Sequence, residues 1–318
     1  MHIPHIIRTF VSKIDKSGNV SIKKCNMKFY KNGNYIVCIK DDGTKIRRTD
    51  GGEFIPQFAE NVDVKITSAC RVGCPFCYEG CTKDGRHADL FGYPFIHSLH
   101  PYTEMALNGN DMDHPDLERF LLFLRERQVY ANITVHQIQF MGNYERIKEY
   151  SENGLIHGIG ISYYCRNDKF FDSVNTMPNA VIHVINGVFS PIDLQYTKNR
   201  GLKILILGYK ELGRGIQYKK DWPSVVARNK AHLYDVLPQM INDEWFSLVS
   251  FDNLAIEQLQ VKRLLSDGEW QEFYMGDDGD YTFYIDMVDG TFARNSLSQE
   301  RYEIGNKSID EMFNIVRK

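Results

Sequence analysis

The stretch ITSACRVGCPFCYEGCTKDG, residues 66–85, carries four of the seven cysteines of the chain. The first three, Cys70, Cys74 and Cys77, follow the spacing Cys-x3-Cys-x2-Cys, and Cys81 comes four residues later. The stretch directly follows NVDVKIT (61–67), whose alternating apolar and polar residues are typical of a β-strand. The sequence therefore predicts a strand that leads into a loop of clustered thiols.

The composition of the chain limits the environment in which these thiols work. Its 318 residues are 43% hydrophobic and 25% charged, with a net charge of −3, and this length suits one large domain with small additions. The chain has no basic excess, no run of about 18 apolar residues that would span a membrane, and no apolar core of a signal peptide near its start. We therefore expect a cytoplasmic protein without a membrane partner, in which clustered cysteines are ligands or catalytic thiols rather than disulfides.

Strand and helix patterns alternate along the middle of the chain. Six segments are predicted as strands, at 61–67, 103–108, 130–136, 156–164, 179–186 and 202–209. Helical patterns are present at 114–128, 143–154 and 191–201. Because short strands that alternate with helices are the signature of parallel βαβ units, we predict an α/β core.

The two ends of the chain differ from this core, so we predict three regions. Residues 1–58 form an N-terminal β-rich extension with hairpin turns at Asn32-Gly33 and Asp42-Gly43, and residues 59–245 form the core. Residues 246–318 form a C-terminal α+β extension. Its predicted elements are helices at 253–266 and 308–318 and a hairpin or meander within 272–296. Both extensions are candidate lids over the site.

The spacing of the three cysteines distinguishes between kinds of metal centre. A structural zinc site usually takes two pairs of ligands separated by a longer loop, and no second Cys or His pair follows here. Three close thiolates instead suit three corners of a [4Fe–4S] cluster with one iron left open. Two alternatives remain: a non-catalytic iron–sulfur or zinc module closed by Cys81, and a thiol redox protein that uses Cys74-x2-Cys77.

With Phe76 directly before the third cysteine, the motif Cys70-x3-Cys74-x2-Cys77 resembles the signature of radical S-adenosylmethionine (SAM) enzymes. The resemblance extends over about residues 60–215 and implies a partial (β/α)6 barrel. It implies an enzyme in which the three cysteines hold a [4Fe–4S] cluster and SAM binds the fourth iron. Reductive cleavage of SAM then yields a radical that takes a hydrogen atom from the substrate. An external electron donor such as flavodoxin or ferredoxin is implied as well.

The resemblance also places SAM at the ends of the later strands. LNGND (107–111) stands where the family has a glycine-rich motif that holds the methionine amine, although it departs from the common Gly-Gly-Glu-Pro. Leu207, Gly208 and Tyr209 are expected to line the adenine through backbone contacts. The implied cofactor-binding residues are Phe76, Asn108, Gly109, Asn110, Asp111, Thr134, His136, Ser162, Asn186, Leu207, Gly208 and Tyr209.

Cys81 lies outside the family motif, and its role stays open. It is a structural thiol, a hydrogen-atom donor or substrate adduct, or a ligand of the resting state. Cys81 is therefore one candidate catalytic residue, and Tyr163, at the end of the fourth predicted strand, is the other. Nearby Glu79 and the segment 213–215 (Gly-Arg-Gly) are expected to be solvated loop.

The core resembles single-domain members of the family that modify peptides. The substrate that this resemblance implies first is a peptide or protein side chain, and the alternative is a nucleotide or nucleic acid. No cysteine follows Cys165, so we expect one cluster and no auxiliary cluster.

Overall fold

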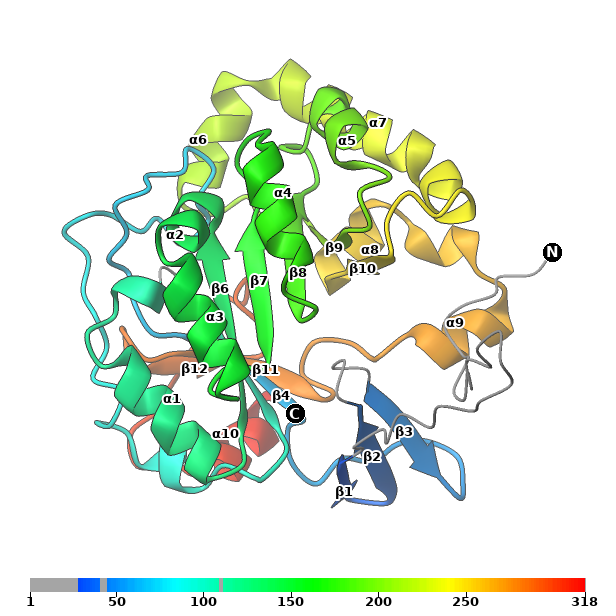
Figure 1. Cartoon of the computed structure of the whole chain (residues 1–318). Coiled ribbons are helices and arrows are strands. Elements are labelled where there is room, and N and C mark those ends of the chain that lie inside the picture. The colour runs from blue at the N-terminus through cyan, green and yellow to red at the C-terminus, as the bar shows by residue number, and fades with distance from the viewer. Residues whose placement is uncertain (1–27, 41–44, 109–110, 318) are drawn as a thin grey trace, which may run out of the picture.

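The structure is a computed structural model that describes residues 28–40, 45–108 and 111–317, and its main feature is a large sheet (Figure 1). This sheet has ten strands in the order β10-β9-β8-β7-β6-β5-β4-β11-β12-β13. Every neighbouring pair from β10 to β11 is parallel, whereas β12 and β13 join in antiparallel fashion. The predicted α/β class is therefore confirmed, with a large and mostly parallel sheet.

The six predicted strands are all present and lie side by side in chain order. They are β4 (Asn61–Lys65), β5 (Glu104–Asn108), β6 (Tyr130–His136), β7 (Gly158–Ser162), β8 (Ala180–Ile185) and β9 (Lys203–Leu207). All six run in the same direction, so their carboxyl ends meet at one edge of the sheet.

The two faces of this sheet differ in chemistry. On one face Val64, Leu107 and Ile161 are fully buried, and helices such as α1, α2 and α4 pack against it. On the other face the alternate residues of β4 and β6 are mostly polar and half-buried, as Asp63 and Thr134 illustrate. A parallel sheet is usually apolar on both faces, so the polar face marks the side on which a polar ligand can be accommodated.

Ten α-helices and three 3₁₀ helices accompany the strands within the described residues. The α-helices are α1 (Leu117–Glu126), α2 (Gln137–Gly142), α3 (Tyr144–Glu152), α4 (Asp168–Asn175), α5 (Pro191–Thr197), α6 (Arg214–Asp221), α7 (Pro223–Asn242), α8 (Asn253–Gln258), α9 (Asp267–Phe273) and α10 (Ile309–Val316). The 3₁₀ helices are η1 (Pro94–His97), η2 (Asp111–Asp113) and η3 (Val261–Leu264). None of the helices in this part of the chain is long and apolar enough to cross a membrane.

The helix predicted at 253–266 is interrupted. Gln260 adopts the left-handed conformation with φ of 50°, so α8 ends before it and η3 begins after it. The helix α7 was not predicted from the sequence, although at 20 residues it is the longest helix of the described chain.

The C-terminal region adds strands to both edges of the sheet. β10 (Leu248–Phe251) pairs with β9, and β11 (Thr282–Asp286) pairs with β4 on the far side. β12 (Thr291–Ala293) returns from β11 through the predicted turn at Asp289-Gly290, and β13 (Tyr302–Glu303) follows. The predicted hairpin is therefore present, and it extends the large sheet.

A second sheet has three antiparallel strands, β1 (Lys28–Asn32), β2 (Tyr35–Ile39) and β3 (Lys45–Thr49). The turn predicted at Asn32-Gly33 is present. It requires glycine, because Gly33 has φ of +61° and a Cβ there would come within 1.8 Å of the Ile55 carbonyl oxygen. The turn predicted at Asp42-Gly43 lies outside the described residues.

The small sheet packs at the amino ends of the large sheet's strands. Glu60, just before β4, is 1% exposed, and its carboxylate accepts hydrogen bonds from Arg47 at 2.8 Å and Tyr35 at 2.6 Å. Lys45 forms an ion pair with Glu104 at 3.1 Å. The prediction that this extension is a lid over the carboxyl ends is therefore wrong for its described part, because these paired charges hold that part at the opposite end.

Candidate functional site

The loop that carries the cysteines begins where β4 ends and is closed by backbone hydrogen bonds. The N–H of Cys70 donates to the carbonyl of Thr82 at 2.7 Å, and the N–H of Thr82 donates to the carbonyl of Ser68 at 3.1 Å. The N–H of Cys77 donates to the carbonyl of Cys74 at 3.2 Å. The two arms of the loop therefore lie side by side, and residues spaced along the chain become neighbours.

The three thiols of the motif are close together and half-buried. Burial, with the nearby Cys77 and Cys70 thiols, raises the pKa of Cys74 to about 11. Within the described residues, no three Cys, His, Asp or Glu side chains converge on the position of a single metal ion. In a [4Fe–4S] cluster each thiolate binds a different iron, so the donor set present fits three corners of such a cluster.

Cys81 is the buried member of the four cysteines, with 6% of its surface exposed. Its thiol donates a hydrogen bond to the sulfur of Cys77. This bond lowers the pKa of Cys77 to about 6 and, together with burial, raises the pKa of Cys81 above its ordinary value. Cys81 thus contacts one residue of the motif.

Arg214, the first residue of α6, holds the cysteine loop in place. Its Nε donates to the carbonyl of Cys74 at 2.9 Å, and its Nη1 donates to the carbonyl of Cys81 at 2.7 Å. Its backbone N–H donates to the carbonyl of Cys77 at 3.0 Å. One residue therefore satisfies three carbonyl groups of the loop.

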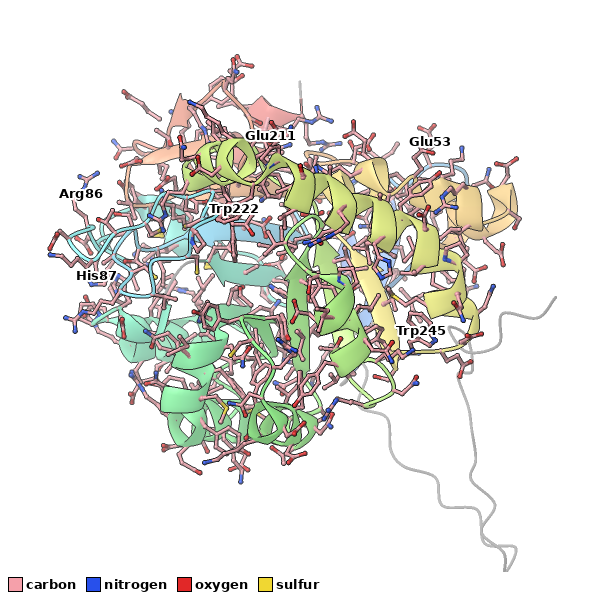
Figure 2. All side chains as sticks on the ribbon, turned by 90° about the horizontal axis from the view of Figure 1, so that it is seen from above. Glu53, Arg86, His87, Glu211, Trp222 and Trp245 are labelled. Carbon is pink, nitrogen blue, oxygen red and sulfur yellow. The ribbon has the colours of Figure 1, made fainter. Side chains whose placement is uncertain are left out.

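The residues around Arg214 fit closely against the same loop. Gly213 has φ of +50°, and a Cβ there would come within 2.4 Å of the Tyr78 carbonyl oxygen. Phe76 packs edge-on against Tyr218 of α6, with ring centroids 5.7 Å apart. The prediction that 213–215 is solvated loop is therefore wrong. Figure 2 looks down on the carboxyl ends of the strands and shows the cysteine loop, with Arg86 labelled, at the left.

Glu79 is also packed inside the protein rather than solvated as predicted. Lys65, the last residue of β4, lies 3.1 Å from the Glu79 carboxylate and 2.9 Å from that of Asp286 at the end of β11. The Tyr284 hydroxyl donates to Glu79 at 3.3 Å. Because the three charged side chains are at most 14% exposed, they tie the loop to the ends of two neighbouring strands.

The strand-end residues predicted to bind SAM are brought to one edge of the sheet. Asn108 lies opposite Lys65 in the strand register, and His136 lies opposite Ser162. Thr134 lies on the same face of β6, two residues before His136. Gly109 and Asn110 lie outside the described residues, and Asp111 begins η2.

Two of these residues have buried polar atoms without a partner among the described residues. In His136, Nδ1 accepts a hydrogen bond from the Ile138 N–H at 3.1 Å, so Nε2 carries the ring proton, and this atom is buried and unpaired. Burial lowers the pKa of His136, which favours the neutral ring. Asn186 is 1% exposed, its N–H donates to the carbonyl of Leu207 at 2.8 Å, and its Oδ1 is unpaired. A donor and an acceptor are therefore available to a ligand.

The backbone groups at the end of β9 are already bonded within the protein. The N–H of Gly208 donates to Asp252 at 2.8 Å. Gln258 accepts from the N–H of Tyr209 at 2.9 Å and donates to the carbonyl of Tyr209 at 3.0 Å. Asn186 Nδ2 donates to the same Gln258 at 3.0 Å. These amide groups of Gly208 and Tyr209, expected to face adenine, are therefore occupied by side chains at the start and end of α8.

Tyr163 is not brought to the cysteines. It follows β7 on the side of the helices, and its ring packs against Phe171 and Phe189. Its hydroxyl donates to Asp193 of α5 at 3.1 Å.

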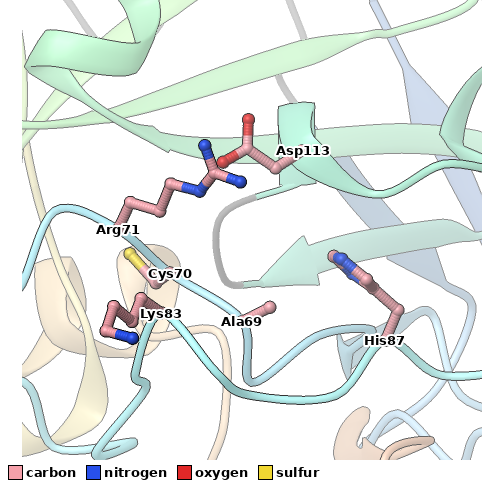
Figure 3. Close-up of a pocket in the computed structure, with 6 residues that line it drawn as sticks. All are labelled: Ala69, Cys70, Arg71, Lys83, His87 and Asp113. Atoms are coloured by element: carbon pink, nitrogen blue, oxygen red, sulfur yellow. The ribbon is translucent and has the colours of Figure 1, made fainter.

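A pocket of about 260 Å³ opens beside the first cysteine of the motif (Figure 3). It is lined by Ala69, Cys70, Arg71, Lys83, His87 and Asp113. Figure 3 shows the Arg71 guanidinium pointing toward the Asp113 carboxylate, above Cys70. The pocket therefore presents both signs of charge next to a candidate iron ligand.

Four residues of this site were not predicted from the sequence: Arg214, Lys65, Asp286 and Gln258. One signal was present in the sequence: Lys65 is a charged residue at a polar position of the alternating strand pattern, directly before the cysteine loop. The partners of the other three are distant along the chain, so no local pattern identifies them.

Comparisons with known proteins identify solved structures that share this fold. No protein-family model matches the chain, and no curated protein matches it. Solved structures do match, and they show that the chain shares an α/β fold with S-adenosylmethionine-bound SuiB of Streptococcus suis. That structure has a TM-score of 0.58 and 10% identity, and the match covers 92% of this chain and 89% of SuiB.

Two further structures of Streptococcus suis SuiB show the same likeness. One has a TM-score of 0.56 and 10% identity, and the match covers 92% of this chain and 87% of that one. The other, SuiB bound to the precursor peptide SuiA, has a TM-score of 0.50 and 13% identity, and the match covers 83% of this chain and 68% of that one. At these identities the likeness is one of fold.

Proposed function

We propose that this protein is a radical SAM enzyme in which Cys70, Cys74 and Cys77 hold a [4Fe–4S] cluster. One observation carries the proposal: a loop with this cysteine motif follows the carboxyl end of β4, with its thiols together, in a fold similar to that of a SAM-bound protein. Strands β4 to β9 would form the partial (β/α)6 barrel, with the site at its carboxyl rim. When bound, the cluster and SAM supply reductive cleavage of SAM and a radical that takes a hydrogen atom from the substrate.

The residues of this chain would bind and orient SAM. Arg71 and Asp113, on the pocket beside Cys70, match the carboxylate and the ammonium of its methionine part. The unpaired His136 Nε2–H and Asn186 Oδ1 match polar groups of the ribose and adenine. We place the remaining contacts at the ends of β5, β6 and β7 and in the segment after β5. The residues proposed there are Asn108, Gly109, Asn110, Asp111, Thr134 and Ser162.

We propose that Cys81 is a structural thiol rather than a ligand. Its side chain is 6% exposed, and its carbonyl is held by Arg214. The contact between Cys81 and Cys77 favours a second candidate function, a closed iron–sulfur or zinc module that four thiolates would complete. The two candidates differ in whether the metal depends on Cys81.

We propose a peptide or protein side chain as the substrate, with a nucleotide or nucleic acid as the alternative. Support comes from the similar fold of SuiB, which was solved with a precursor peptide, and from the polar inner face of β4 and β6. The electron would come from an external donor such as flavodoxin or ferredoxin. Absence of a basic excess also favours a peptide over a long nucleic acid.

Anaerobic reconstitution with iron and sulfide tests the proposed function. We expect about four irons per chain, and 5′-deoxyadenosine when SAM and a strong reductant are added. Cys81→Ala should keep both, whereas Cys74→Ala should lose both. A full cluster that yields no 5′-deoxyadenosine would refute the enzyme, and loss of all metal in Cys81→Ala would establish the closed module.

A further inference from the structure

A second pocket lies at the opposite end of the large sheet from the cysteines. Its volume is about 260 Å³, and it lies between the small sheet, the amino end of β6 and the ends of α1 and α3. In Figure 1 these elements are in the lower part of the molecule, away from the arrowheads of β6 and β7. The pocket belongs neither to the cysteine loop nor to the strand ends proposed for SAM.

The charged residues that line this pocket are all basic. Lys28, Lys40 and Arg125 contribute three cations, and no Asp or Glu is among the lining residues. Within the described residues, none of the three forms an ion pair. Arg125 uses one donor on the carbonyl of Asn153, 3.3 Å away, and keeps its charge. Three cations that no carboxylate of the described residues neutralises, in one concave site, attract an anion.

Apart from Gln128, the rest of the lining is apolar or aromatic. Ile39, Val129 and Leu155 are buried beside the cations. Tyr130 and His157 stack with ring centroids 4.0 Å apart and form a flat wall. A bare phosphate would satisfy the cations but leave this half-exposed aromatic wall in water, whereas a chain of alternating acidic and apolar side chains would cover both.

We propose that this pocket binds an acidic segment of a peptide, with carboxylates on Lys28, Lys40 and Arg125. The role of this segment rests on the proposed peptide-modifying function, although the binding itself does not. β6 extends from Tyr130 in the pocket to His136 at the rim, a separation of about 20 Å over its residue steps of about 3.3 Å. The segment would therefore be a recognition element at least about six extended residues from the side chain that reacts.

Peptide binding to the full-length protein tests this proposal. The probe is a fluorescein-labelled decapeptide of alternating Glu and Leu, followed by fluorescence anisotropy at low salt. We expect the double variant Lys40→Glu/Arg125→Glu to bind it at least about tenfold more weakly, since each like charge near the site repels the ligand. Lys220→Glu, an exposed site on α6, makes the same kind of charge change outside the pocket and should bind normally.

Two further binding measurements identify the chemical class of the ligand. The same peptide with Gln in place of Glu should bind at least about tenfold more weakly. Inorganic phosphate should displace the acidic peptide only through ionic strength, as sodium chloride does. Equal binding by the double variant and the wild type would overturn the proposal, and so would specific displacement by phosphate, which would assign the pocket to small anions.

Two controls distinguish a loss of peptide binding from a loss of folding and from a loss of the proposed chemistry. Thermal melting checks each variant, and Lys40→Ala/Arg125→Ala replaces the charge-reversal pair if that pair does not fold. Failure of the wild type to form 5′-deoxyadenosine would refute the proposed function and leave peptide binding intact. Absence of peptide binding in an active wild-type enzyme would refute the pocket and leave the chemistry intact.

Discussion

Replacing Arg214 with alanine removes the guanidinium that holds the cysteine loop but leaves the backbone N–H that reaches Cys77. Two hydrogen bonds are lost, to the carbonyls of Cys74 and Cys81. A hydrogen bond from a charged donor contributes about 1.5–3 kcal/mol, and the half-buried position of Arg214 favours the lower value. We therefore expect the closed loop to lose about 3 kcal/mol, which corresponds to about a hundredfold larger population of open loop.

The assay is the rate at which the reconstituted protein releases iron to a chelator under anaerobic conditions. If release proceeds through the open loop, Arg214→Ala should release iron about a hundredfold faster than the wild type. Arg214→Lys keeps the positive charge but loses the planar set of N–H donors of the guanidinium, so its rate of iron release should be intermediate. Lys220→Ala, an exposed change on the same helix, is the matched control and should release iron at the wild-type rate. A wild-type rate for Arg214→Ala would refute the role assigned to this residue.

Three other changes test separate features. Gly213→Ala should prevent stable cluster binding, because the residue has φ of +50° and the new Cβ would meet the Tyr78 carbonyl at 2.4 Å; iron content after reconstitution measures this. Glu79→Gln should lower the unfolding free energy by about 1–3 kcal/mol, because it removes one of the two carboxylates that Lys65 contacts; denaturant melts measure this. His183→Phe should reduce the acid sensitivity of the fold, which melts across pH 4 to 6.5 report.

His183 lies on β8, and the sign of its effect follows from its burial. Burial lowers the pKa of His183 from 6.5 to about 4, so the unfolded chain binds a proton in that window and the native protein does not. Stability is therefore full above pH 6.5 and falls as the pH falls toward 4, by up to about 3 kcal/mol. An unchanged pH slope in His183→Phe would contradict this account.

Controls for the other two variants use neighbouring positions. Gly80 lies in the cysteine loop with φ of +64°, and a Cβ there would meet no atom within 4 Å. Gly80→Ala therefore introduces backbone strain without the steric clash that Gly213→Ala adds. Full iron in Gly213→Ala would show that the loop adapts. Asp84→Asn changes an exposed carboxylate and should leave stability within about 0.5 kcal/mol. An equal effect of Asp84→Asn and Glu79→Gln would contradict the buried network.

The strands were predictable because their signal is local. In segments such as 61–67 and 130–136 every second residue is apolar, and this pattern alone places one face against the helices. The pairing of β11 with β4 was not predictable, because it joins Thr282 to Asn61 across most of the chain. In contrast, α7 has a local signal that was missed, because its buried residues Val226, Leu233, Leu237 and Met240 recur at helical spacing.

By itself, the sequence determined the chemistry that is available: three thiols at a fixed spacing, a strand before them, and polar residues at the ends of parallel strands. Tertiary structure alone decided how these residues are held. Arg214 reaches the cysteine loop from more than a hundred residues away, and Lys65 lies between a loop carboxylate and one from the C-terminal region. The reason is physical: spacing along the chain places ligands within a loop, whereas the partners of buried charges and carbonyls depend on which distant segments the fold brings together.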